Sequence, residues 1–229
     1  MKKEKILYDN ILGNEWIDWV EKSNPAGSRE KEIYPFIKKW LKKSKPAILI
    51  DIGCGQGICS TLLNKKTKYI GIDSSLVLIK RARKLYPSSG KKFIEGDVAK
   101  LPLKDNSADA VMSIWVWSHI KNLDSAAKEM WRVLKPKGNF LIVTANPETY
   151  KTRKSFYKYY KEKNGLLTGV FDLGNGKVLT NTTLHLHSKK KIESVIKQAG
   201  LVVGSIRRIA KAKSYKQGLY LVIRGHKFH

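Results

Sequence analysis

Between residues 46 and 145, short apolar runs alternate with longer amphipathic stretches, and this rhythm limits the possible folds more than any other feature. The apolar runs predict strands at 48–50, 69–72, 92–95, 110–114 and 139–144. The stretches between them predict a helix that ends near residue 64 and helices at 76–84 and 123–134. Strands that alternate with helices indicate an α/β fold with a mostly parallel sheet, covered by helices on both faces.

The flanking regions follow other patterns. Residues 6–43 predict two helices interrupted by a turn-rich segment at 23–28. Near the other end, residues 189–199 predict a helix that stops at Gly200, and residues 201–209 and 219–224 predict two strands that pair as a hairpin.

Residues 147–187 have no strong periodicity, but two of their segments are informative. The turn residues at 172–176 predict a hairpin. The aromatic segment 155–161 predicts a helix with Phe156 and Tyr160 on one apolar face, although its interleaved lysines and tyrosines are also typical of surfaces that stack bases and contact phosphates.

One loop carries the strongest functional signal. The run Ile48-Leu49-Ile50-Asp51-Ile52 reads as a buried strand, and Gly53-Cys54-Gly55-Gln56-Gly57 follows it before a helix. Glycines permit a tight turn and let a ligand approach the backbone. The spacing is G-x-G-x-G rather than the dinucleotide fingerprint G-x-G-x-x-G, and either pattern alone can be only a turn.

Acidic residues at neighbouring strand ends strengthen this signal. Asp73 ends the second predicted strand, 16 residues after Gly57, where a carboxylate can accept both hydroxyls of a ribose. Asp97 follows the third strand, where a carboxylate can accept from an adenine amine, and Asp109 opens the fourth. Each acid can instead cap the next helix. Together with Asp51, however, Asp73 and Asp97 mark the carboxyl ends of three strands, where open α/β sheets bind ligands.

Four segments carry a joint signal: the glycine loop, Gly71-Ile72-Asp73-Ser74-Ser75, the run 95–102 around Gly96-Asp97-Val98, and the run 129–138 that ends in Leu-Lys-Pro-Lys-Gly. Together they resemble the class I methyltransferases, specifically the type 11 methyltransferase domain. The last run departs mildly from the family's usual Leu-Lys-Pro-Gly-Gly. The resemblance covers about residues 46–145. It implies a Rossmann-like three-layer sandwich, a seven-stranded sheet with an antiparallel last strand, and the cofactor S-adenosyl-L-methionine.

The resemblance also implies positions for the cofactor-binding residues. Asp51, Gly53 and Gly55 would line its methionine end, with Cys54 and Gly57 in the same loop. Asp73 with Ser74 would hold the ribose, and Asp97 with Val98 the adenine. Ile114 and Trp115 would border the sulfonium. Arg29 stands where similar enzymes often contact the cofactor carboxylate, although it can equally be a solvated helix-end arginine.

On this basis we divide the chain into two parts. Residues 1–45 are expected to form an N-terminal helical segment that covers the cofactor site, and residues 46–229 the methyltransferase domain. Within that domain, residues 147–187 are expected to form an insert that caps the substrate site, because acceptors dock between the fifth and sixth strands of similar enzymes.

His119 is the one candidate catalytic residue. It follows the fourth predicted strand, where it could act as a general base for a hydroxyl or amine acceptor. It could also pack against the cofactor and orient the loop, which the resemblance favours. Trp115 could stabilise the sulfonium through its indole face, whereas Trp117 can be a core residue. No metal site is expected, because His185 and His187 have no carboxylate or cysteine near them in the sequence.

Charge is the chain's most unusual bulk property. Lys and Arg number 45 against 19 Asp and Glu, which gives a formal net charge of +26. Residues 151–229 hold 18 basic and 3 acidic residues, whereas residues 101–150 hold 6 and 5. Such a field favours anionic partners. Because 37 of the 45 are lysine and nucleic-acid recognition usually relies on arginine, we favour composition and solubility as the explanation.

The leading hypothesis is a methyltransferase that acts on an O, N or C atom of a small molecule, which the charge would allow to be anionic. An RNA or tRNA methyltransferase that uses the basic C-terminal third is the alternative. Against it, the sequence has no appended RNA-binding module, and Ile114-Trp115-Val116-Trp117 replaces the Asn/Asp-Pro-Pro-Tyr/Phe motif. A non-catalytic nucleotide-binding protein is a third possibility, which the intact glycine loop argues against.

The sequence also gives expectations for location. It has no apolar run long enough to span a bilayer and no signal-peptide pattern at residues 1–5, so we expect a cytoplasmic protein. Cys54 and Cys59 have no partner cluster, which argues against a disulfide framework and a zinc site.

Overall fold

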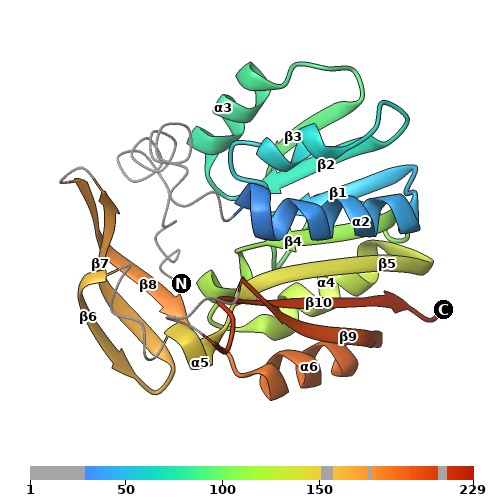
Figure 1. Ribbon diagram of the computed structural model, residues 1–229. Helices are drawn as coiled ribbons and strands as arrows, with labels where there is room; N and C mark the ends of the chain where they lie inside the picture. The colour runs from blue at the N-terminus through green and yellow to red at the C-terminus, as the bar shows by residue number, and fades with distance from the viewer. Residues whose placement is uncertain (1–28, 151–156, 175–176, 211–215) are drawn as a thin grey trace.

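The computed structural model describes residues 29–150, 157–174, 177–210 and 216–229. A seven-stranded sheet with the order β3-β2-β1-β4-β5-β10-β9 forms its centre (Figure 1). Strands β3, β2, β1, β4 and β5 are parallel, and β10 runs antiparallel to both of its neighbours. The strands are β1 (Ile48–Ile52), β2 (Lys68–Asp73), β3 (Lys91–Glu95), β4 (Ala108–Ile114), β5 (Leu134–Ala145), β9 (Leu201–Ile209) and β10 (Tyr220–Lys227). The expected α/β architecture with an antiparallel last strand is confirmed.

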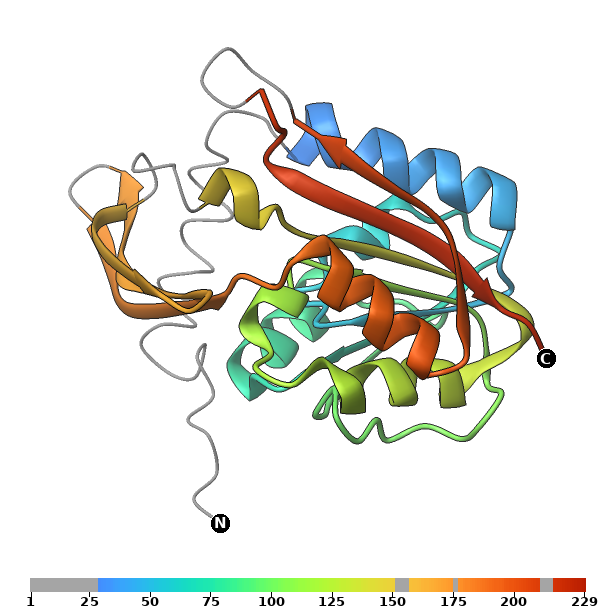
Figure 2. The ribbon, with the colours of Figure 1, turned by 90° about the horizontal axis from the view of Figure 1, so that it is seen from below.

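Helices cover both faces of this sheet (Figure 2). Helices α2 (Tyr34–Ser44) and α3 (Leu76–Leu85) contribute to one buried cluster, and α4 (Leu123–Val133) and α6 (Lys189–Gln198) contribute to the other. Successive side chains of β1 point to opposite faces of the sheet, so Leu49 packs in the first cluster and Ile50 in the second. The molecule is therefore the three-layer sandwich that the sequence predicts.

Short helical turns link these elements: η2 (Arg29–Ile33), η3 (Ile58–Leu62), η4 (Trp117–His119) and α5 (Pro147–Tyr150). The helix expected to end near residue 64 is instead the short 3₁₀ helix η3. Its continuation is blocked because the Asn64 side-chain oxygen accepts hydrogen bonds from the backbone N–H groups of Lys66 and Thr67, which turns the chain toward β2.

A second, three-stranded antiparallel sheet stands beyond the carboxyl ends of the parallel strands (Figure 1). It consists of β6 (Tyr157–Lys163), β7 (Leu166–Gly174) and β8 (Lys177–His185). The hairpin predicted around 172–176 is confirmed, because Gly174 pairs with Lys177.

The helix predicted over 155–161 is wrong, since the part of it that the structure describes lies in β6. Tyrosines favour strands, and Asn164 and Gly165, with φ of 52° and 80°, form the tight turn that pairs β6 with β7. The Asn-Gly pair was the signal for this hairpin. Phe156 lies outside the described residues.

Within the described ranges, no helix is long and apolar enough to cross a membrane. Those same ranges contain no group of three or more His, Cys, Asp or Glu side chains placed to hold a metal ion. The first of the two predicted N-terminal helices lies outside the described residues, whereas α2 matches the second and packs on the sheet through Ile37 and Trp40.

Candidate active site

The glycine loop leaves β1 at the carboxyl-end edge of the sheet. Its first two backbone N–H groups, of Gly53 and Cys54, donate to the Ile72 carbonyl at 2.7 and 3.0 Å, which ties the loop to β2. A Cβ added at Gly53 would clash with Val116, and one added at Gly57 would clash with Phe93. At Gly55, which has φ of 54°, a Cβ would meet nothing within 4 Å. The loop is therefore packed against protein at both ends and open at its middle.

Asp73 lies beside this opening. One oxygen of its carboxylate accepts from the Gly55 N–H at 2.8 Å, and the other accepts from the Ser75 N–H at 2.9 Å. Ser74, between these partners, is exposed. The end of β2 thus presents a carboxylate that is already held in place by the glycine loop.

Asp51 lies beneath the loop and is buried, with 1% of its surface exposed. Its carboxyl accepts a hydrogen bond from the Tyr69 hydroxyl at 2.6 Å. Burial raises the pKa of Asp51 to about 7, and the nearby charge of Asp73 adds to the rise, whereas the Tyr69 hydrogen bond opposes it. The carboxyl is therefore close to its titration midpoint at neutral pH.

No sequence motif identifies Tyr69 as a site residue, although the strand pattern contains the signal. Asp51 pairs with Gly71 across the parallel ladder, and Tyr69 lies two residues before Gly71, so both side chains point to one face. Gly71 has no side chain opposite Asp51, and a Cβ there would press on Cys54 and Tyr69. The glycine thus makes room for the Tyr69–Asp51 hydrogen bond.

The third predicted acid lies at the same edge. Asp97 follows β3, next to Gly96, whose N–H donates to the Asp73 carbonyl at 2.9 Å. The Asp97 side chain is exposed, and its Oδ1 accepts from the Ala99 N–H at 2.8 Å, while Val98 is half-buried. The structure therefore brings Asp97 near the end of β2.

Asp109 is separate from these acids. It lies at the amino end of β4, where its carboxylate accepts from the Ile48 N–H at 2.7 Å and pairs with Lys135 at 2.8 Å. These contacts join β1, β4 and β5 at the opposite edge of the sheet, so the role of Asp109 is structural.

The end of β4 borders the opening from the other side. Ile114 and Trp115 are half-buried, and Trp115 has φ of 63°, a left-handed conformation that is costly for a side chain of its size. Its N–H donates to the Val143 carbonyl at 2.7 Å, and its ring lies 5.6 Å from that of Tyr220. Trp117 has 2% of its surface exposed and is a core residue, as the sequence allowed.

His119 connects this loop to the small sheet. Burial lowers the pKa of His119 to about 4, against the opposing effect of a hydrogen bond with the Thr183 backbone. Close by, a ring nitrogen of His187 hydrogen-bonds the Ile120 carbonyl at 2.7 Å, and the His185 and His187 rings lie 6.0 Å apart. The histidines therefore join η4 to β8 and the segment after it.

Two further predictions concern side chains around the loop. Cys54 and Cys59 are buried free thiols, and burial raises the pKa of Cys54 well above its usual value. Neither forms a disulfide, as expected. Arg29 opens η2, but its side chain lies outside the described part of the structure, so its predicted contact with the cofactor stays a prediction.

Comparisons with known proteins agree with this geometry. A family model described as a methyltransferase domain matches residues 50–142. An uncharacterised protein of Methanocaldococcus jannaschii is 30% identical over 198 residues, which cover 86% of this chain and 85% of that protein. The demethylmenaquinone methyltransferase of Thermotoga maritima is 28% identical over 179 residues, which cover 72% of this chain and 77% of that enzyme.

Solved structures share the fold. A protein from Pyrococcus horikoshii aligns with a TM-score of 0.69 at 20% identity, over 95% of this chain and 92% of that one. A S-adenosylmethionine-dependent methyltransferase from Methanosarcina mazei aligns with a TM-score of 0.66 at 21% identity, over 86% of this chain and 98% of that one. The glycine loop, the sheet order and these relatives lead to one conclusion: the chain belongs to the class I S-adenosylmethionine-dependent methyltransferases.

Proposed function

We propose that this methyltransferase binds its cofactor over Gly55 and beside Asp73, and that it methylates an O, N or C atom of a small-molecule acceptor. The open space at Gly55 carries the first part, because an added Cβ would meet no protein atom within 4 Å there. A loop that is packed at Gly53 and Gly57 but open between them fits a bound ligand.

The ends of β2 and β3 fit the nucleoside half of the cofactor. The Asp73 carboxylate is a charged acceptor held in place by the N–H groups of Gly55 and Ser75, and the ribose hydroxyls would donate to it. Ser74 would lie beside the same sugar. Asp97, with an exposed carboxylate, and Val98 would contact the adenine.

Asp51 fits the methionine half. Its pKa of about 7 means that a positive charge nearby would shift it toward the ionised form. The ammonium group of the cofactor supplies such a charge, with Gly53 and Cys54 lining the same end. Ile114 and Trp115, at the end of β4, would border the reacting methyl group.

S-adenosylmethionine supplies an activated methyl group, so the protein mainly has to orient the acceptor and keep water out. We assign the small sheet β6–β8 to this task as the cap over the acceptor. His119 would hold the cap through its hydrogen bond with the Thr183 backbone. With a pKa of about 4, this histidine is neutral at pH 7 and a weak base, which favours positioning over general-base catalysis.

Calorimetric titration with S-adenosylhomocysteine tests the cofactor position. Gly55→Val should abolish binding, because two methyl groups would fill the open space. Gly165→Val is the matched control: it places the same side chain at another glycine with positive φ, in the β6–β7 turn, and should bind as the wild type does. Full binding by Gly55→Val would overturn the proposal.

Incubation with radiolabelled cofactor and fractionated cell extract tests the acceptor. We expect label in the small-molecule fraction. Label in RNA instead would replace the small-molecule proposal with the alternative acceptor class, and label in no fraction from an enzyme that binds S-adenosylhomocysteine would contradict this acceptor proposal.

A further inference from the structure

A basic groove lies at the amino-end edge of the large sheet, opposite the candidate active site. It runs between the C-terminal end of α2 and the loop before β2, and its volume is about 540 Å³. Leu41, Leu62 and Leu63 are among its lining residues, and none of the described residues that line it is acidic. Its cationic lining residues are Lys38, Lys42, Lys45 and Lys66, all exposed.

The described part of the protein does not neutralise these four charges. None of the ion pairs between described residues involves any of them. Asp105 and Asp109, at this edge, are paired with other cations, since Asp105 pairs with Arg132 at 2.6 Å and Asp109 with Lys135 at 2.8 Å. Like charges held close together repel, so binding of an anion in the groove lowers the free energy.

The backbone makes two of the lysines at this edge unusual. Lys45 follows α2 with φ of 42°, and its N–H donates to the Leu41 carbonyl at 2.9 Å, a helix end that normally carries glycine. Lys137, in the turn where the family usually has Leu-Lys-Pro-Gly-Gly, has φ of 63°. A left-handed conformation costs a non-glycine residue roughly 1 kcal/mol. Positive charge therefore occupies two places that the backbone favours for glycine.

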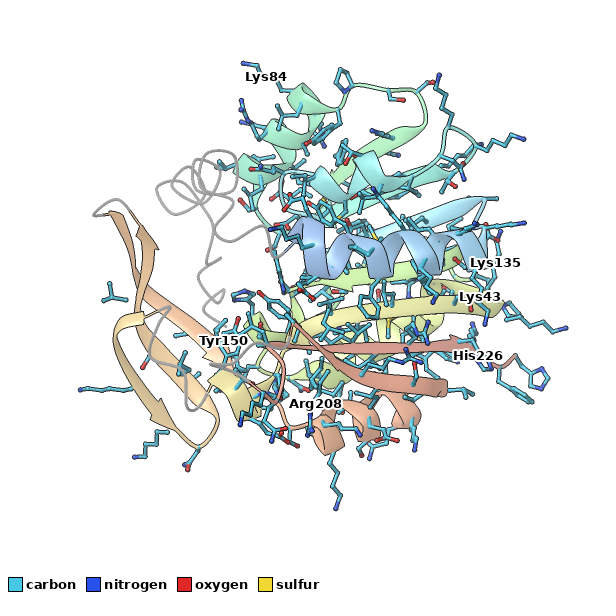
Figure 3. All side chains as sticks on the ribbon, viewed as in Figure 1. Lys43, Lys84, Lys135, Tyr150, Arg208 and His226 are labelled. Atoms are coloured by element: carbon cyan, nitrogen blue, oxygen red, sulfur yellow. The ribbon has the colours of Figure 1, made fainter. Side chains whose placement is uncertain are left out.

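The positive charge continues beyond the groove along the edge. Lys68 pairs with Ile48, and Lys91 pairs with Tyr69, so lysines begin the next two strands, β2 and β3. In the other direction, Lys43 lies at the same edge, on the right of the view in Figure 3. Lys135 lies there too, but its charge is paired with Asp109. A row of this length fits an extended polyanion better than a compact anion.

We propose that this groove binds the sugar–phosphate backbone of a nucleic-acid strand, without reading its base sequence. Lysine ammonium groups neutralise phosphates as point charges, whereas base readout usually needs the planar fork of arginine. The described residues that line the groove include no arginine and no aromatic side chain, so they offer neither bidentate base contacts nor stacking.

A flexible strand fits the groove better than a membrane surface does. The lysines line a groove, which a flat bilayer does not enter. The described large apolar side chains that are exposed, and could insert into lipid, do not line the groove; they are Leu76, Trp131, Leu166, Val202 and Phe228. Because the groove lies opposite the active site, the proposal does not depend on which acceptor is methylated.

Fluorescence anisotropy with labelled oligouridine tests the proposal. Neutralising four phosphates should weaken binding about 50-fold between about 50 and 200 mM salt, from a slope of −0.7 per phosphate for single strands. The groove variant Lys38→Gln/Lys42→Gln/Lys45→Gln/Lys66→Gln should remove that share of the salt dependence. A second variant, with glutamine at four exposed lysines on or next to α4 and α6, has the same net charge: Lys121, Lys128, Lys189 and Lys190.

The expected result is that the control variant binds as the wild type does, while the groove variant binds weakly with a flatter salt slope. An oligonucleotide of mixed sequence should bind as oligouridine does. Equal loss in both variants would show that net charge alone matters, and wild-type binding to phosphatidylglycerol vesicles but not to oligouridine would assign the surface to membranes; either overturns the proposal. S-adenosylhomocysteine affinity, which should be unchanged in both variants, tests the proposed function separately.

Discussion

The two edges of the large sheet use the same backbone conformation in opposite ways. At the carboxyl-end edge, the left-handed positions after β1 are glycines, and Gly55 leaves open space. At the amino-end edge, Lys45 and Lys137 occupy left-handed positions and carry charge. The glycines leave space for a ligand, whereas the lysines place a positive charge where glycine would place none.

The edges also differ in how their charges are compensated. At the carboxyl-end edge, Asp51 and Asp73 accept hydrogen bonds from the chain's own Tyr69 hydroxyl and Gly55 N–H. At the amino-end edge, the groove lysines have no ion-pair partner among the described residues. One edge is therefore preorganised for a ligand of defined shape, whereas binding at the other edge depends on charge and should respond strongly to salt.

A change at Asp51, at the preorganised edge, should have the largest effect on the free energy of unfolding. Its folded pKa of about 7 lies above the ordinary value of 3.8, so its contribution to stability is fully present below about pH 4 and is lost as the pH rises through 7. Asp51→Asn removes this titration and should be more stable than the wild type at about pH 8, by up to ~4 kcal/mol.

Urea unfolding across this pH range measures the effect. The gain should shrink toward about pH 4, and Asp51→Asn should bind S-adenosylhomocysteine more weakly if the carboxylate faces the ammonium group. A stability difference that does not change with pH would contradict the buried titration.

The contribution of His119 to stability should change with pH in the opposite direction. Its folded pKa of about 4 lies below 6.5, so its contribution to stability is present above pH 6.5 and is lost as the pH falls toward 4. The total is up to ~3 kcal/mol, and His119→Gln should flatten this part of the stability curve.

Kinetics separate the two roles of His119. As a positioning residue, it should cause modest decreases in turnover and cofactor affinity together when it is changed to alanine. A decrease in turnover of ~10²-fold or more with unchanged cofactor affinity would instead identify a general base.

How far the sequence predicts this molecule depends on whether a signal is local. The parallel core was predictable because each of its strands is an apolar run next to an amphipathic helix, and Asp73 was predictable because it ends such a run. The Tyr69–Asp51 hydrogen bond depends on the register of two strands. The groove depends on α2 meeting the loop before β2, two segments that carry no shared motif.

The small sheet shows a different limit. Its Asn164-Gly165 turn is a local signal that favours a hairpin, but the spacing of Phe156 and Tyr160 competes with it and favours a helix. Pairing with β7 decides in favour of the strand. The contacts of β8 with His119 bring together residues more than 60 positions apart and have no pattern in the sequence.

Asp73→Ala tests how much the carboxylate at the end of β2 contributes to cofactor binding. The carboxylate accepts from the Gly55 N–H and would accept from the ribose hydroxyls, so its loss should weaken S-adenosylhomocysteine binding by ~1.5–3 kcal/mol. Calorimetry measures this directly. The matched variant Asp109→Ala removes a carboxylate from the opposite edge and should leave the affinity close to the wild-type value. Unchanged affinity in Asp73→Ala would remove the ribose role from this residue.

The smallest effect concerns the backbone of the charged edge. Lys137→Gly restores the residue that a left-handed position prefers and should raise the free energy of unfolding by ~0.5–1 kcal/mol, since the relief of strain exceeds the extra entropy of glycine in the unfolded chain. Lys137→Gln removes the charge but keeps the strain, so thermal unfolding should find it no more stable than the wild type. If Lys137→Gln gained as much stability as Lys137→Gly, repulsion among the lysines rather than backbone strain would be the cost at this position, and the contrast between the two edges would be one of charge alone.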